Sequence, residues 1–68
     1  MSSIAKVITI IGSSPAGFAE AAQAAVTEAA KTLRDIHGIQ VVSMSAEVDG
    51  DQITQFRTTV NIAFGVER

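Results

Sequence analysis

Few residues of this 68-residue chain have side chains suited to acid–base or nucleophilic chemistry. It contains one histidine, His37, and no cysteine, which excludes thiol nucleophiles, disulfides and cysteine-bound zinc. Asp35 lies two residues before His37, but no nucleophile can be placed beside this pair. A histidine at a predicted helix end is usually a surface residue, because the helix dipole favours cationic side chains there. The sequence therefore predicts a protein that is not an enzyme.

Three carboxylates lie close together around a predicted turn, at Glu47, Asp49 and Asp51. Carboxylate oxygens bind hard cations such as calcium or magnesium, but the regular ligand spacing of a calcium loop and its final bidentate glutamate are missing. The turn itself explains Asp49 and Asp51, because aspartate is favoured in turns. A divalent-cation site through Glu47 is therefore an alternative interpretation of this cluster.

Two further positions could meet an anion. Ser13 and Ser14 precede a predicted helix, where backbone N–H groups can bind phosphate, although helix capping explains both serines without a ligand. Arg57 interrupts the polar face of a predicted strand, between Gln55 and Thr59. Its guanidinium could pair with a carboxylate such as Glu47 of a neighbouring subunit, which is the favoured interpretation, or it could contact an anionic ligand.

The first half of the chain predicts a strand followed by a helix. Residues 6–11 are rich in β-branched side chains and end at a glycine, which is typical of a strand. Ser14 and Pro15 have the residue types of a helix start, and the alanine-rich residues 15–35 predict the helix itself. We expect Gly38 to end this helix as a left-handed cap. One apolar stripe follows the helical period, through Phe18, Ala22, Ala25, Ala29, Leu33 and Ile36.

The second half predicts two strands, at residues 39–48 and 53–66, joined by a turn with the hairpin signal Asp-Gly. The last strand alternates clearly between two faces. We expect one face to pack against the helix, and it carries Phe56, Thr58, Val60, Ile62, Phe64 and Val66. The other face is polar and would line an interior or a ligand pocket in an oligomer; it carries Gln55, Arg57, Thr59, Asn61 and Ala63. The predicted fold is α+β, with the order β-α-β-β and a single domain over residues 1–68.

Composition narrows the class of protein further. With 47% apolar and 18% charged residues the chain is not expected to be disordered, and its net charge of −2 lacks the basic excess of a general nucleic-acid binder. The N-terminus lacks a signal-peptide pattern and no apolar run approaches the ~20 residues of a membrane span, so we expect a cytoplasmic protein that does not enter a membrane. A domain this small is marginally stable alone, which predicts oligomerisation.

Several segments of the chain match one family in type, order and spacing. They are KVI at 6–8, IIGSSP at 10–15, AKTLR at 30–34, VV at 41–42, DG at 49–50 and VNIAF at 60–64. Over nearly its whole length the chain resembles the dodecin family. The resemblance implies a three-stranded antiparallel sheet curved around one helix, assembled into a hollow homododecamer. It also implies a non-enzymatic protein that binds and stores a small molecule, commonly riboflavin, FMN or FAD.

The resemblance also implies where a flavin would bind. Flavin-binding members stack the ring on a tryptophan early in their second strand, where this chain has Gly38, and hydrogen-bond its edge with an amide in the third strand, where it has Arg57 beside Phe56. The implied cofactor-binding residues are Gly38, Gln55 and Arg57. The alternative is a flavin-free dodecin-like shell with a structural role or a calcium-type cation site at Glu47. A further alternative is a module that binds partners at a sheet edge.

Overall fold

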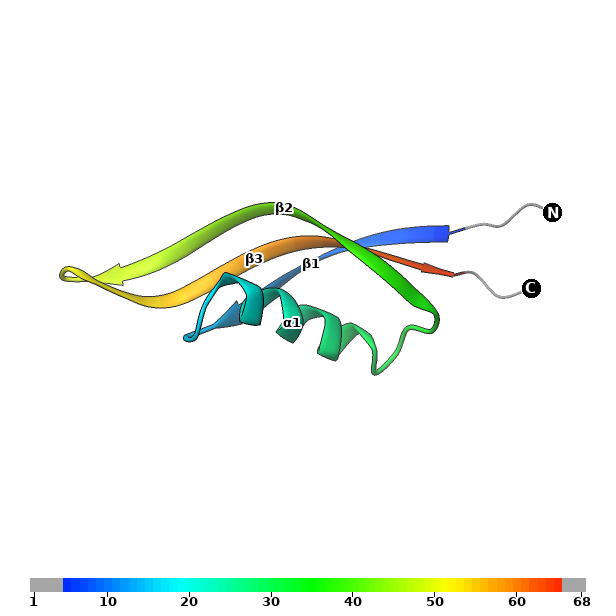
Figure 1. Ribbon diagram of the computed structural model, residues 1–68, viewed down its shortest axis with the longest axis horizontal. Helices are drawn as coiled ribbons and strands as arrows, with labels where there is room; N and C mark the ends of the chain where they lie inside the picture. Colours follow the sequence, from blue (N-terminus) through cyan, green and yellow to red (C-terminus); the bar gives the residue numbers. More distant parts are fainter. Residues whose placement is uncertain (1–4, 66–68) are drawn as a thin grey trace.

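The computed structural model describes residues 5–65, in which three strands and one helix follow the predicted β-α-β-β order (Figure 1). The elements are β1 (Ala5–Ser14), α1 (Phe18–Ala29), β2 (Ile36–Asp49) and β3 (Gln52–Gly65). β3 lies in the middle of the sheet and pairs antiparallel with both β1 and β2. The predicted fold class is confirmed for this chain.

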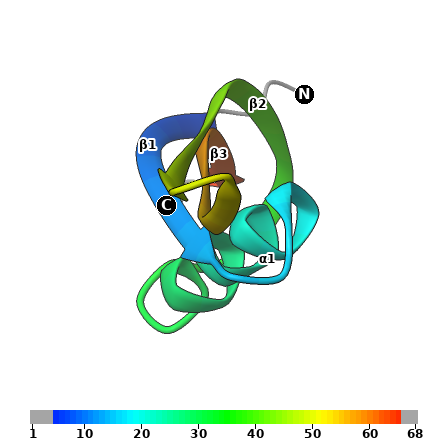
Figure 2. The ribbon, with the colours of Figure 1, turned by 90° about the vertical axis from the view of Figure 1, so that its left-hand side faces the viewer.

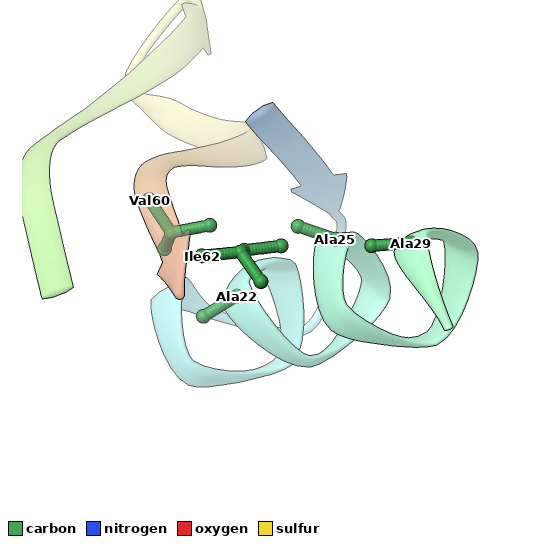
Figure 3. Close-up of a cluster of buried hydrophobic side chains, with 5 residues drawn as sticks. All are labelled: Ala22, Ala25, Ala29, Val60 and Ile62. Carbon is green, nitrogen blue, oxygen red and sulfur yellow. The ribbon is translucent and has the colours of Figure 1, made fainter. Parts of the chain in front are cut away.

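The core lies between α1 and the middle of the sheet. Val60 and Ile62 of β3 are fully buried and point toward the helix (Figure 3). The helix meets them with the side chains of Ala22, Ala25 and Ala29, and Ala21 of α1 is buried as well. Small side chains on the helix allow it to lie very close to the sheet. The predicted core face of the third strand is confirmed by Thr58, Val60 and Ile62, whereas Val66 lies outside the described residues.

Gly12 marks the closest approach between the helix and β1. A Cβ atom at this position would overlap the carbonyl oxygen of Ala21 and lie 3.0 Å from the backbone nitrogen of Ala25. Gly12 pairs with Thr58 within the sheet, so β1 continues through this glycine to Ser14 rather than ending before it as predicted. The glycine therefore provides the space that α1 occupies.

The start of the helix differs from the prediction. α1 begins at Phe18, after Gly17, and no side chain caps it. Ser14 instead ends β1, and its Oγ accepts a hydrogen bond from the backbone nitrogen of Ala16 at 3.0 Å. Such a bond from a residue two positions along the chain stabilises a turn. The predicted capping role of Ser14 is therefore replaced by a role in the β1–α1 turn.

The end of the helix also comes earlier than predicted. α1 ends at Ala29, and the chain turns back toward the sheet at Asp35, which adopts a left-handed φ of 62°. The backbone nitrogen of Gly65 donates to the Asp35 carbonyl at 3.0 Å and fixes this return. β2 therefore begins at Ile36, so His37 and Gly38 lie in a strand, and the prediction that Gly38 caps the helix is wrong. The contact fixes the return of the chain to the sheet, six residues after the helix has ended at Ala29.

β2 and β3 form a long hairpin that curves (Figure 2). The Asp-Gly turn is confirmed, with Gly50 at a φ of 66°. The register shifts at three places along the β2–β3 pair, at Ile36/Gly38, Val41/Ser43 and Glu47/Val48. Such bulges bend a strand and increase its twist, which accounts for the curvature.

The helix covers β1 and β3, and the tip of the hairpin extends beyond it (Figure 1). The chain measures 54 × 20 × 13 Å, which is too thin to bury both faces of the sheet. Large apolar side chains therefore stay exposed on the outer strands and near the hairpin tip. They are Val7, Ile11, Ile39, Val41, Val42, Met44, Val48 and Ile53.

Candidate functional site

The face of the sheet opposite the helix carries two neighbouring rows of residues near the start of β2. Directly paired residues of neighbouring strands place their side chains on the same face. The register puts Thr9, Asn61 and Gln40 into one row across β1, β3 and β2. The next row contains Val7, Ala63 and Gly38. The first row is polar and the second is apolar or has no side chain.

The polar row is connected by hydrogen bonds. Thr9 Oγ1 donates to Asn61 Oδ1 at 2.7 Å, and Asn61 Nδ2 donates to Gln40 Oε1 at 3.4 Å. The donors all point in one direction, from β1 toward β2. The row therefore ends at Gln40 with its oxygen already engaged.

A pocket of about 380 Å³ lies beside this row. That volume falls at the lower end of the range for small-molecule sites. The pocket combines an apolar wall with two amides, and its lining consists of Val7, Gly38, Ile39, Gln40, Asn61 and Ala63. It can hold an apolar planar group whose edge forms hydrogen bonds.

Gly38, the first predicted cofactor-binding residue, lines this pocket. A Cβ atom built on Gly38 has no other atom within 4 Å, so the space beside it is open. Among the glycines of residues 5–65, Gly50 alone has a φ in the left-handed region, so the backbone of Gly38 is in a region open to other residue types. The backbone at this position therefore accommodates any side chain, including a large aromatic one.

Arg57 and Gln55 lie on the same face of the sheet but toward its other end. Arg57 pairs with Ser45, and Gln55 pairs with Glu47. Arg57 is six residues from Ala63, the partner of Gly38, which corresponds to about 20 Å along the strand. A single chain does not bring Gly38 together with Gln55 and Arg57. A site that contains all three stays a prediction and needs residues from more than one copy.

The guanidinium of Arg57 forms an ion pair with the carboxylate of Glu47 in the same chain. Both side chains are partly exposed, at 37% for Arg57 and 55% for Glu47. Glu47 was expected as the partner of Arg57 across subunits, and the structure forms the pair between β2 and β3 of one chain. A pair between subunits stays a prediction.

The predicted cation site at Glu47 gains no further ligands from the fold. Within residues 5–65, no group of three or more histidine, cysteine, aspartate or glutamate side chains lies close enough to hold a metal ion. The Glu47 carboxylate is instead bound by Arg57. Calcium or magnesium binding is therefore not supported by this arrangement.

Gln40 is a pocket residue that sequence reasoning missed, as are Val7 and Ile39. The position of Gln40 two residues after Gly38 places both on one face of β2. However, its contact with Asn61 depends on the register between β2 and β3, which a bulge at Ile36/Gly38 shifts by one residue. The sequence signal that could have identified Gln40 was its side-chain amide, two residues after Gly38 in a predicted strand.

Comparisons with known proteins agree on the architecture. The family model for dodecin matches residues 4–67. The dodecin from Streptomyces coelicolor has a TM-score of 0.92 and 26% identity, with 97% of this chain and 94% of that chain covered. The dodecin from Streptomyces davaonensis has a TM-score of 0.94 and 24% identity, with full coverage of both chains. A mutant of the Thermus thermophilus dodecin has a TM-score of 0.94 and 24% identity, with 98% and 100% covered.

A comparison with curated proteins found no significant match. Among residues 5–65, no helix combines the length and the apolar character needed to cross a membrane.

Proposed function

This chain belongs to the dodecin family, and we propose that it binds and stores a flavin such as riboflavin or FMN, without catalysing a reaction. The proposal is carried by the pocket at Gly38, which lies in a dodecin fold at the position where the family resemblance implies the flavin ring. Membership of the family supports the broader role of a small-molecule binding protein.

The pocket residues fit the chemistry of a flavin ring. The ring has a planar apolar body, which the aliphatic wall of Val7, Ile39 and Ala63 can contact. Its edge carries carbonyl and N–H groups, which the amides of Gln40 and Asn61 can bind. The chain lacks tryptophan altogether, and a stacking aromatic contributes on the order of 1–3 kcal/mol to ring binding. We therefore expect weaker flavin binding than in a relative with an aromatic platform.

We further propose that the chain assembles into a homododecamer. The exposed apolar side chains of β2 support assembly, since Val41, Val42 and Met44 are each about half exposed in the single chain. Obligate assemblies bury such surfaces against further copies. Assembly would also allow Gln55 and Arg57 of one copy to approach the Gly38 pocket of another.

Flavin fluorescence tests the proposal directly. Riboflavin or FMN at constant concentration is titrated with the protein, and we expect saturable quenching of the flavin emission. Replacing Ala63 in the pocket wall by leucine should weaken binding, because the longer side chain fills part of the pocket. The matched control is Ala24→Leu on the exposed side of α1, which should leave the titration unchanged.

Two results would overturn parts of this proposal. Unchanged fluorescence at high protein concentration would exclude flavin storage and leave the flavin-free shell. A mass from light scattering that corresponds to a monomer or dimer would exclude the dodecamer.

A further inference from the structure

We propose that Gln40 makes this pocket selective for a neutral heteroaromatic ring that presents a hydrogen-bond acceptor, such as a ring carbonyl, to its side-chain amide. This inference rests on the proposed function, because it assumes that the pocket at Gly38 is a ligand site. It goes further by assigning the donor–acceptor requirement of the ligand to one residue.

The direction of the hydrogen bonds decides which atom of Gln40 is available. The hydroxyl of Thr9 has one proton, and it is donated to Asn61 Oδ1 at 2.7 Å. Asn61 must then present its NH₂ group to β2, where it donates to Gln40 Oε1 at 3.4 Å. Gln40 Oε1 accepts this hydrogen bond, whereas Gln40 Nε2 donates to no side chain among the described residues, so its two donors are available to the pocket that Gln40 lines. The ligand atom that binds these donors is an acceptor.

The lining explains why the ligand should be neutral. The pocket residues are aliphatic side chains, a glycine and two amides, with no charged group among them. Arg57 is four residues from Asn61, the nearest pocket residue of β3, which corresponds to about 13 Å along the strand, and it is already paired with Glu47. A charged group in this pocket would lose its hydration without gaining a counter-charge. A neutral carbonyl group loses less hydration free energy on entering the pocket, and it gains the hydrogen bond from Gln40.

A substitution that keeps the row intact isolates this role. In Gln40→Glu, the carboxylate can still accept the hydrogen bond from Asn61, but it presents an acceptor to the ligand in place of two donors. Two acceptors facing each other repel. Gln40 is exposed, so the substitution should not unfold the chain. The matched control is Gln23→Glu on the exposed side of α1, where the same change of charge lies on the far side of the sheet.

Two probes provide the readout: they share one ring system, but one carries hydrogen-bond acceptors where the other carries donors. Quinazoline-2,4-dione carries two ring carbonyls, and 2,4-diaminoquinazoline carries two amino donors in their place. Binding of each is followed by ¹⁵N–¹H shifts of the protein at a pH where both rings are neutral. We expect the unsubstituted protein and Gln23→Glu to bind the dione at least tenfold more tightly than the diamine. Gln40→Glu should reverse that preference.

Thr9→Val tests the origin of the polarity in the row. Without the Thr9 proton, the amide of Asn61 is no longer held in one orientation, so the preference for the dione should shrink while the fold persists. If Gln40→Glu and Gln23→Glu preferred the dione over the diamine to the same degree, the inference would be overturned, even if the protein binds flavin. Conversely, a reversed preference in a protein that does not quench flavin would uphold the inference and reject flavin storage.

Discussion

Thr58 Oγ1 donates a hydrogen bond of 2.8 Å to the backbone carbonyl oxygen of Phe18, the first residue of α1. Thr58 is almost fully buried, at 1% exposure, and the rings of Phe18 and Phe56 meet edge to face beside it with centroids 4.9 Å apart. One polar contact and one aromatic contact therefore hold the start of the helix on the middle strand. The hydrogen bond anchors the helix start, but it goes to a carbonyl and so does not replace a side-chain cap, which would accept from N–H groups.

Replacing Thr58 by valine should destabilise the protein by about 1 kcal/mol, because a hydrogen bond is lost while the shape is kept. Urea unfolding at a fixed protein concentration measures the change. Thr59→Val, on the opposite face of the same strand, is the matched control and should have little effect. Equal stability of the two variants would show that this hydrogen bond does not anchor the helix.

Replacing Gly12 by alanine should destabilise the fold by several kcal/mol, since the new Cβ atom would overlap the backbone of α1 at Ala21. Gly38→Ala adds the same methyl group where no atom lies within 4 Å and should be tolerated. Thermal unfolding of the pair is the measurement. A tolerated alanine at position 12 would mean that the helix can shift away from β1 at small cost.

The pair of Arg57 and Glu47 should contribute little to stability. For partly exposed ion pairs the coupling energy is about 0.2–1 kcal/mol, and salt weakens it. A double-mutant cycle of Arg57→Ala and Glu47→Ala at low and high salt measures this value. Because the pair forms within one chain, the mass of the proposed assembly should not change in either variant. Dissociation of the assembly in Arg57→Ala would restore an inter-subunit role for the arginine.

Introducing an aromatic platform should strengthen flavin binding. The space beside Gly38 is open, so Gly38→Trp should add roughly 1–3 kcal/mol of stacking energy. Adding Arg57→Gln should increase affinity further only if an amide from another copy reaches the ring. Fluorescence titration compares both variants with Gly38→Leu, which adds bulk without an aromatic face. Identical titrations for tryptophan and leucine would place the flavin elsewhere.

Local patterns in the sequence were sufficient to predict the order of the elements and the buried face of β3. Alternation placed Val60 and Ile62 in the core, and Asp-Gly located the hairpin turn. The return of the chain at Asp35 could not be predicted, because it is fixed by Gly65, thirty residues further along the chain.

The candidate site, too, could be predicted only where it does not depend on contacts between residues far apart in the sequence. Gly38 was predicted from family resemblance and lines the pocket, whereas Arg57 was expected to pair with Glu47 of a neighbouring subunit and pairs with it in the same chain. The role of Gln40 depends on which residues of β1 and β3 lie opposite it. That register is set by a bulge, and no local pattern in the sequence identifies where the bulge occurs.

The exposed outer strand β2 also makes the single chain prone to aggregation. It is 14 residues long, and its other edge has no partner strand within the described chain. An open apolar edge is a template for uncontrolled pairing with other chains. In the proposed dodecamer, dilution would favour dissociation, and each dissociated copy would carry this hazard. The proposed assembly would therefore make the concentration of the protein a determinant of whether it stays folded.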